Sequence, residues 1–250
     1  MIRGLYTAAA GMLAGLFRHE TTVHNLANVR TVGYKADRAT TVDFPSMLLT
    51  RIRNGEAGPE VGDMGTGVSL SSLATDFSEG PMKLTDHPFD FAVAGEGFFR
   101  VQTPDGVRYT RDGRFHRDVD GSLVNAQGYR VLGQDGPITL PHGQLAVSGQ
   151  GALYVDDEYV DQLSMATVDD VTTLLKDGDT MFNTRAGQEA QIMAPEEVQV
   201  YQGYIEDSNV DVAQVVTEMT SALRAYQISQ KMVQYQDQIN SKSVSEIGRV

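Results

Sequence analysis

The stretch NVDVAQVVTEMTSALRAYQISQKMVQYQDQINSKSVSEI, residues 209–247, decides the fold of this chain. No Gly or Pro interrupts it, and its first apolar residues alternate steps of four and three, the spacing of a heptad seam. A helix over most of this stretch would be about 50 Å long at roughly 1.5 Å rise per residue. A narrow apolar stripe on so long a helix needs another helix to cover it. The seam residues are Val212, Val216, Met219, Leu223, Tyr226 and Val233.

The apolar stripe shifts to another face in the second half of the stretch. Gln230 fills one seam position, and Asp237 and Asn240 continue the old seam as polar residues. A second stripe replaces it at Ile228, Met232, Tyr235 and Ile239. We therefore expect the surface that receives a partner to change partway along the helix.

A matching seam begins at the other end of the chain. The same alternation predicts a helix over about the first thirty residues, with small residues such as Ala8 and Gly11 on its flanks. We interpret His19 as a polar residue that sets register, in preference to a pH-sensitive contact. The two helices are expected to pair as a coiled coil. The N-terminal and C-terminal seams together are expected to form the assembly interface. The N-terminal seam is Ile2, Leu5, Ala9, Met12, Leu16, His19, Val23 and Leu26.

The residues between the two helices indicate an arm and a β domain. Gly and Pro punctuate the polar segment after Tyr34, which is typical of an extended arm. Short runs rich in β-formers follow, separated by four Asp-Gly pairs that favour tight hairpins. The fold class is therefore α+β, with a mainly antiparallel β domain inserted between paired terminal helices. The expected ranges are the helix 1–30, the arm 31–76, the β domain 77–184, a returning link 185–204 and the helix 205–250.

Composition restricts the possible partners and the cellular location of the protein. The net charge of −13 and the pI near 4.7 argue against a nucleic-acid partner. There is no Cys, so no disulfide holds the fold. No apolar run is long enough for a membrane span. The heptad continues past any plausible cleavage site, so we expect the N-terminus to be retained without a cleaved signal peptide.

A search for catalytic and metal-binding patterns is unproductive. His19-Glu20 and His24 come near the zinc-protease pattern, but the second His is five residues on and leaves the shared helix face. Asp156-Asp157-Glu158 lies in a polar stretch where surface solvation is the simplest interpretation. We expect no enzyme activity, no cofactor and no metal.

The end of the first helix is expected to be an assembly joint and not a ligand site. Two Asn side chains can bond to helix-end groups there, and Gly33 suits a positive φ. A Val at this glycine should block assembly while leaving the β domain folded. The joint residues are Asn25, Asn28, Thr31, Gly33, Tyr34, Lys35 and Arg38.

Several stretches resemble the bacterial flagellar basal-body rod and hook family, in the family's order. They are MIRGLYTAAAGM (1–12), NLANVRTVGYKADR (25–38), DFAVAGEGFFRVQTPDGVRYTRDGRF (90–115), YQGYIEDSNVDV (201–212) and RAYQ (224–227). The resemblance implies a structural subunit that polymerises helically into the axial shaft transmitting motor torque to the hook. It implies contacts with further copies, with other rod and hook proteins, with the surrounding ring proteins and with the export apparatus. It also implies a location in the basal-body rod that spans the periplasm.

Two kinds of rod subunit remain open, as does one function of another class. The start MIRGLYTAA, the patch FPSMLLTRI (44–52) and YQGYIEDSNVDV resemble the distal rod subunit, which we prefer. The short chain and the stretch VLGQDGPITLP (131–141) are more similar to the proximal rod subunit. The other class is a β domain that binds or degrades the cell wall, supported only by the acidity of the β insert.

Overall fold

The computed structural model describes residues 2–44, 47–53, 56–65, 67–168, 170–178, 180–184, 190–194, 197 and 199–247. The chain forms two compact units and passes between them more than once. Unit 1 combines Met1–Leu26, Asp37–Ala74 and Val212–Val250, and unit 2 combines Ala27–Ala36 and Thr75–Asp211. The expected α+β class is confirmed, with a helix near each end and a mainly antiparallel β region between them.

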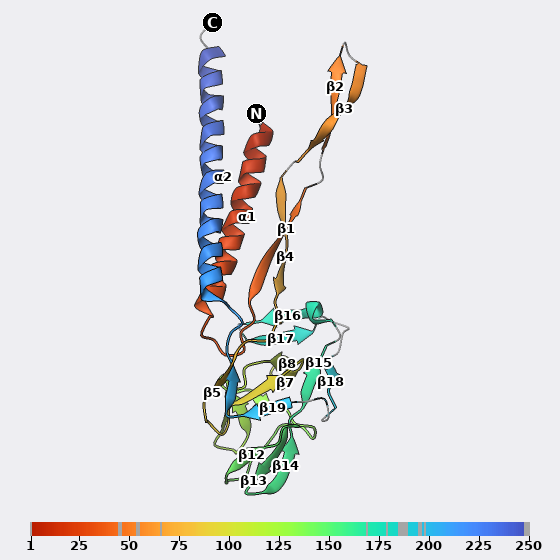
Figure 1. Ribbon diagram of the computed structural model, residues 1–250, viewed down its shortest axis with the longest axis vertical. Helices are drawn as coiled ribbons and strands as arrows, with labels where there is room; N and C mark the ends of the chain where they lie inside the picture. The colour runs from red at the N-terminus through yellow and green to blue at the C-terminus, as the bar shows by residue number, and fades with distance from the viewer. Residues whose placement is uncertain are drawn as a thin grey trace. The chain divides into compact units, whose positions relative to one another are not determined.

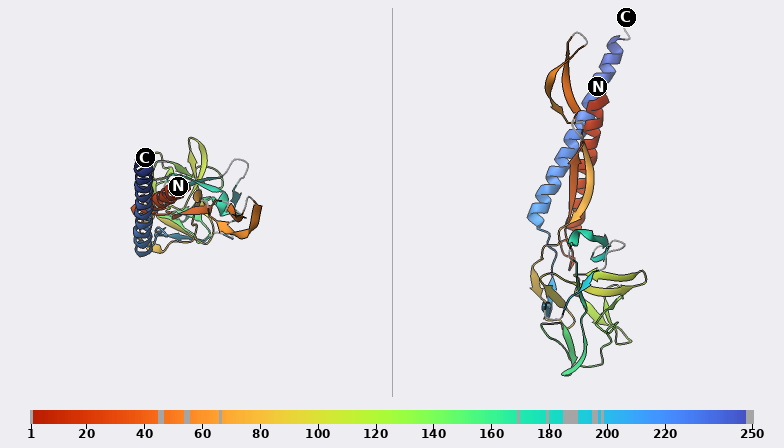
Figure 2. Two further views of the ribbon diagram at one scale, coloured as in Figure 1. Left: turned by 90° about the horizontal axis from the view of Figure 1, so that it is seen from above. Right: turned by 90° about the vertical axis from the view of Figure 1, so that its right-hand side faces the viewer.

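Unit 1 is built on the two helices, α1 (Ile2–Ala27) and α2 (Val212–Ile247), which lie side by side in Figures 1 and 2. The second helix begins later than the expected range of 205–250, because residues 204–206 form a strand of unit 2. Neither helix, in the residues that the structure describes, is both long and apolar enough to cross a membrane.

The arm of unit 1 consists of two strand pairs, one nested inside the other in the sequence (Figure 1). It was expected over 31–76, but residues 31–36 belong to unit 2. The reason is that residues 32–35 are buried in unit 2. The outer pair is β1 (Asp37–Asp43) with β4 (Val68–Thr75), and the inner pair is β2 (Met47–Arg53) with β3 (Glu56–Met64).

Unit 2 contains a nine-stranded sheet centred on β7, which pairs with β8, β11 and β15. The order along the main path is β16-β17-β8-β7-β11-β10-β9, and β18 pairs with β15. The strands are β7 (Phe98–Thr103), β8 (Gly106–Thr110), β9 (Phe115–Arg117), β10 (Leu123–Asn125), β11 (Arg130–Val131), β15 (Met165–Thr167), β16 (Leu174–Asp177), β17 (Met181–Thr184) and β18 (Gln191–Ile192). A short 3-10 turn, η1 (Val171–Thr173), precedes β16.

Three smaller sheets complete unit 2. One is a meander of β12 (Leu145–Val147), β13 (Ala152–Val155) and β14 (Glu158–Gln162). In the others, the chain returning from the β region pairs with its beginning. Strand β19 (Gln199–Gln202) pairs with β6 (Phe91–Ala94), and β20 (Tyr204–Glu206) pairs with β5 (Met82–Leu84). The expected link 185–204 therefore contains strands β18 and β19 and the start of β20, while residues 185–189, 195, 196 and 198 lie outside the described residues.

The core of unit 2 explains why these late strands belong to it. Val200 of β19 is 4% exposed and packs in the main apolar cluster with Phe91, Phe99 and Phe115. A second cluster forms around Phe98 and Phe182. Burial of a Val or Phe side chain contributes about 1.5–3 kcal/mol relative to its exposed state. The β unit is thus completed only by residues that follow the range expected for it.

Three of the four Asp-Gly pairs lie in tight chain reversals, as expected. Asp105-Gly106 connects β7 to β8, Asp120-Gly121 connects β9 to β10, and Asp135-Gly136 lies in a turn closed by the Leu132–Pro137 bridge. The hairpin expected at Asp112-Gly113 is wrong. The chain there pairs instead with the segment around β6, where Phe91 N donates to Gly113 O at 3.0 Å.

Candidate functional site

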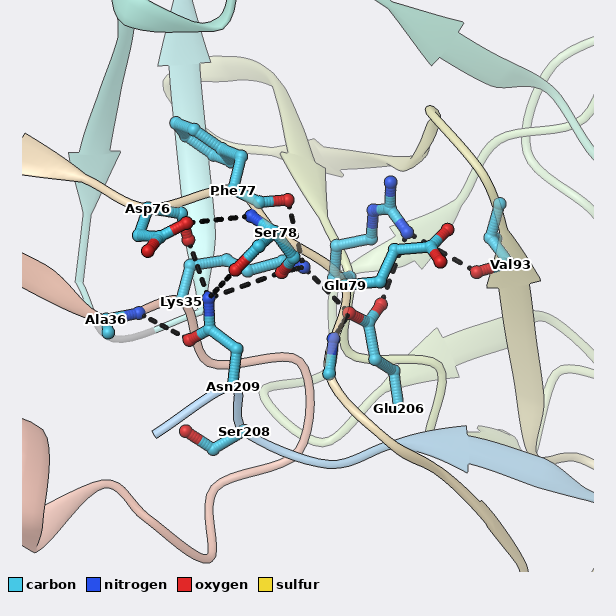
Figure 3. Close-up of polar contacts among 12 residues, drawn as sticks. Lys35, Ala36, Asp76, Phe77, Ser78, Glu79, Val93, Glu206, Ser208 and Asn209 are labelled. Carbon is cyan, nitrogen blue, oxygen red and sulfur yellow. Dashed lines mark hydrogen bonds and ion pairs between the residues drawn. The ribbon is translucent and has the colours of Figure 1, made fainter. Parts of the chain in front are cut away.

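The candidate site lies in unit 2, next to three of the four points where the chain crosses between the units. The crossings follow Leu26, Ala36, Ala74 and Asp211. The side chain of Asn209 joins the segments of unit 2 at the last three crossings (Figure 3). Its Oδ1 accepts from Ala36 N at 2.8 Å, and its Nδ2 donates to Asp76 O at 2.8 Å. Asp76 N in turn donates to Ala36 O at 2.8 Å, so the segments are also bonded directly.

A buried group of charges lies beside Asn209 and is centred on Glu206 (Figure 3). Lys35 is fully buried, and its Nζ donates to Glu206 Oε1 at 2.7 Å. Arg111, from the segment after β8, donates through Nη1 to Glu206 Oε2 at 3.2 Å. Gly80 N donates to Glu206 Oε1 at 2.8 Å. We call Lys35, Arg111, Glu206 and Asn209 the crossing cluster.

The ammonium of Lys35 receives further acceptors from the second crossing segment. It donates to Ser78 O at 2.7 Å and to Phe77 O at 3.4 Å. Burial lowers the pKa of Lys35 from its usual range, and the Glu206 carboxylate opposes this shift. The short contact with a carboxylate and two carbonyl groups satisfies a charge that would otherwise be costly to bury.

Arg111 extends the crossing cluster toward the main sheet. Its Nη2 donates to Gly95 O at 2.7 Å and its guanidinium carbon lies 5.0 Å from the centre of the Phe98 ring. Its buried Nε has no hydrogen-bond partner among the described residues. Two cations therefore share one buried carboxylate, so Glu206 carries most of the charge compensation in this part of the molecule.

The turn that delivers Lys35 requires glycine at position 33. Gly33 has φ +69°, which confirms the expected positive φ. A Cβ atom at this position would lie 2.3 Å from Asp112 N and 2.4 Å from Arg111 C, both backbone atoms. The turn thus packs directly on the backbone of unit 2. A Val there should disturb the β unit itself, which corrects the expectation that only assembly would be affected.

The expected joint residues divide between the two units. Asn25 makes two hydrogen bonds with the backbone of Asp37. Asn25 Nδ2 donates to Asp37 O at 2.7 Å, and Asp37 N donates to Asn25 Oδ1 at 2.9 Å. Asn28 Oδ1 accepts from Thr31 Oγ1 at 3.0 Å, which closes the turn after α1. Arg38 is exposed.

Tyr34 and Lys35 are instead core residues of unit 2. Both are 0% exposed, and the Lys176 ammonium lies 3.9 Å from the centre of the Tyr34 ring. Sequence reasoning missed the partners Arg111, Glu206 and Asn209. The motif YQGYIEDSNVDV contained two of them, but it carried no sign of which residues would be buried.

The expected assembly residues lie on the helix pair of unit 1. Glycines of α1 lie close to α2, and one of them, Gly15, approaches the seam residue Tyr226. A Cβ atom on Gly15 would lie 3.1 Å from Tyr226 N, one on Gly11 would lie 3.2 Å from Ser229 Oγ, and one on Gly4 would lie 3.0 Å from Gln236 Nε2. The residue numbers rise along one helix as they fall along the other, so the helices run antiparallel.

This close approach leaves much of the apolar seam at the surface. Leu16, Val23, Val212, Val216 and Leu223 are 38–49% exposed. Side chains at Leu5, Ala9, Met12, Leu26, Met219, Tyr226 and Val233 are half-buried, and so is that of His19. The side chain of Ile2 lies outside the described ones. The seam is therefore only partly covered by the partner helix of the same chain.

A groove of about 670 Å³ lies on one side of the helix pair, next to β1. Small residues of both helices line it, among them Ala14, Gly15, Ser221 and Ala225. Arg18 lies at this groove and donates through Nη2 to Thr41 Oγ1 at 2.8 Å.

The acidic stretch of the β unit has a local structural role. Asp156 and Asp157 both have positive φ, 50° and 67°, and form the two-residue turn between β13 and β14. Asp156 Oδ1 accepts from Gln144 N at 2.9 Å. Among the described residues there is no group of three or more His, Cys, Asp or Glu that could hold a metal ion.

Two family models match the chain. Residues 92–157 match the flagellar hook protein FlgE/F/G D1 domain, and residues 201–246 match the C-terminal region of the flagellar basal body rod FlgEFG proteins. The first match lies within unit 2, and the second contains Glu206, Asn209 and most of α2.

Curated relatives match along the whole chain. The flagellar hook-basal body complex protein FlhO of Bacillus subtilis is 34% identical over 271 residues, covering 100% of both chains. The flagellar basal-body rod protein FlgG of Agrobacterium fabrum is 31% identical, covering 96% of this chain and 97% of the relative. The flagellar basal-body rod protein FlgF of Caulobacter vibrioides is 29% identical, covering 100% of both. With the terminal helices, the β unit and the crossing cluster in place, the chain belongs to the flagellar basal-body rod and hook family.

Proposed function

We propose that the protein is a structural subunit of the flagellar rod that assembles with further copies through the apolar faces of α1 and α2. The observation that carries the proposal is the exposure of large apolar side chains along both helices. Leu16, Val23, Val216 and Leu223 are 38–42% exposed, although each occupies a heptad position. Exposed apolar surface of this extent on a helix pair marks an interaction site.

The crossing cluster supports the role of a load-bearing subunit. Its buried ion pairs and the Asn209 amide connect three of the four segments through which the two units are linked in the chain. We propose that these contacts, with the joint residues around Gly33, keep the connections in one conformation. The remaining expected partners are other rod and hook proteins, the surrounding ring proteins and the export apparatus.

We prefer a place in the distal rod. The motifs FPSMLLTRI and YQGYIEDSNVDV support it, and the proximal rod is the alternative. The identities to FlgG and FlgF relatives, 31% and 29%, are too close to decide between them. Basal bodies from a strain lacking this chain distinguish the two: a rod that ends before its distal segment supports the preference, and a rod that lacks its proximal segment supports the alternative.

Assembly through the seam is tested with Leu16→Asp and Leu223→Asp. Each places a charge on an apolar face, where burial of an unpaired carboxylate is strongly unfavourable. We expect soluble, folded subunits that fail to enter the rod and cells that do not swim. Glu158→Gln, on exposed β14, is the control and should assemble. Normal rods and motility in both Asp variants would contradict the proposal.

A further inference from the structure

We propose that the β12–β14 meander of unit 2 binds an arginine side chain from a basic segment of a partner protein. The feature that carries the proposal is an exposed pair of tyrosines on this meander (Figure 1). Tyr154 of β13 lies opposite Tyr159 of β14, and their ring centres are 5.9 Å apart in an edge-to-face arrangement. Tyr159 is 54% exposed, and Tyr154 is half-buried.

The meander leaves the tyrosine pair uncovered. On the other side of β13, the residue opposite Tyr154 is Ala146 of β12, which is exposed and too small to cover a ring. Strand β14, which carries Tyr159, is at the edge of the three-stranded sheet. Aromatic side chains are enriched at protein interfaces, because each ring offers a large contact area.

Negative charge surrounds the tyrosine pair. Residues 131–175 contain seven Asp and Glu and no Lys or Arg. The turn that carries Asp135 lies next to β14, since Gln134 N donates to Gln162 O at 2.9 Å. Partial burial raises the pKa of the Tyr159 hydroxyl, and the carboxylates of Asp161 and Asp135 raise it further. Both carboxylates therefore lie within electrostatic range of the ring. We call Tyr154, Tyr159, Asp135 and Asp161 the tyrosine patch.

Asp161 is only 8% exposed, but no cation compensates its charge. Its Oδ1 accepts from Gln162 N at 2.7 Å, and its carboxylate lies against Gly133. In the part of the chain that the structure describes, Asp161 forms no ion pair. A buried carboxylate normally has a cation as partner, as Glu206 has in the same unit. A cation bound at the tyrosine patch would supply this missing compensation.

A guanidinium group fits both components of the patch. It stacks on an aromatic ring and donates two parallel hydrogen bonds to a carboxylate. The same combination occurs inside unit 2, where the Arg111 guanidinium lies 5.0 Å from the centre of the Phe98 ring and donates to Glu206. The net charge of −13 would also attract a basic segment from a distance. A neutral ligand would use the rings but gain nothing from the carboxylates.

The probe for this site is a fluorescently labelled tetra-arginine peptide, titrated with the purified full-length protein. Fluorescence anisotropy at about 0.15 M salt measures binding, because charges more than about 8 Å away are then largely screened. We expect saturable binding that Tyr159→Ala weakens about two- to fivefold, the effect of an exposed contact between a cation and a ring. Asp135→Asn should weaken binding to a similar extent.

Matched controls distinguish the patch from general attraction to an acidic protein. Tyr201→Ala removes another exposed ring, from β19, and Asp105→Asn removes another exposed charge, from the turn between β7 and β8. Neither should change the affinity. Equal weakening by Asp105→Asn and Asp135→Asn would overturn the site, and so would unchanged affinity of Tyr159→Ala or the absence of saturable binding.

A comparison of peptides tests the stacking without any substitution in the protein. Tetra-lysine has the same charge as tetra-arginine, but its ammonium groups are strongly hydrated and cannot stack on a ring. The unaltered protein should therefore bind tetra-arginine more tightly, and equal affinities would overturn the proposed contact. This comparison remains decisive if Tyr159→Ala fails to fold, which its near-ultraviolet circular dichroism would show. All these measurements use the subunit in solution, so their outcome does not depend on whether the chain enters the rod.

Discussion

Replacement of Glu206 by glutamine should remove a large part of the stability of the β unit. The change keeps the size of the side chain and leaves an acceptor for Gly80 N, but it removes the charge that balances Lys35 and Arg111. Both cations are buried, with side chains 0% and 4% exposed. Loss of one partner from a buried ion pair costs about 3–5 kcal/mol, against a total stability of about 5–15 kcal/mol for a typical domain. We expect the variant to be marginally folded.

Urea unfolding of the purified full-length subunit measures this effect. The near-ultraviolet circular dichroism of the aromatic side chains in the β unit reports its tertiary structure. With a slope of about 1–3 kcal/mol per molar urea, a loss of this size lowers the midpoint by more than about 1 M. The control is Glu158→Gln, which removes an exposed carboxylate from β14 and should leave the midpoint unchanged. A loss below about 1 kcal/mol for Glu206→Gln would refute the reasoning, because surface charges contribute that little.

A double-mutant cycle separates pairing from other effects of the substitution. Lys35→Met removes one of the two cations, so its combination with Glu206→Gln leaves less unbalanced charge than Glu206→Gln alone. The combined loss should therefore be smaller than the sum of the two single losses. Simple additivity would indicate that the two side chains do not interact.

Three further predictions concern the same unit. Gly33→Ala should lower the unfolding midpoint much more than Gly95→Ala. Both glycines have positive φ, but a Cβ on Gly95 meets nothing within 4 Å. Equal decreases of the midpoint would mean that the positive φ alone causes the effect. The pKa of Lys35 is lowered in the folded protein, so between that lowered pKa and the usual 10.5 the unfolded chain holds more protons than the folded one. The free energy of unfolding should therefore rise with pH in this window. Lys35→Met should abolish the rise, and Lys83→Met, on exposed β5, should not. A chain ending at Asp211 should retain the folded β unit, whereas one ending at residue 198 should lose it with β19 and β20; circular dichroism and limited proteolysis compare the two.

The terminal helices could be predicted from the sequence because their signals are local. Apolar spacing without Gly or Pro indicates a helix whatever surrounds it, and α1 ends at Ala27, close to the expected position. The contact between the helices was harder to anticipate. Glycines have no side chain to mark a seam, so a search for large apolar residues finds the stripes that stay partly exposed and leaves Gly11 and Gly15, which lie close to α2, on the flanks of the expected seam.

The crossing cluster could not be predicted because its partners are far apart in the sequence. Lys35 and Glu206 are separated by 171 positions, and each lies in a polar context that resembles a solvated surface. The same reason hid β19 and β20, which pair with strands more than a hundred residues earlier. Asp156 and Asp157 are exposed, as expected for surface charges, and they also form the turn between β13 and β14, because Asp tolerates positive φ.

Three of the four chain connections between the units meet at Asn209, which has a mechanical consequence. A single peptide linker resists pulling but twists freely, because rotation about its φ and ψ bonds is soft. Three connections leaving one bonded cluster behave differently, since a rotation of any one of them strains the hydrogen bonds that hold Ala36, Asp76 and Asn209 together. For the rod subunit proposed above, the expected consequence is that these bonded connections resist twisting more than a single flexible linker would.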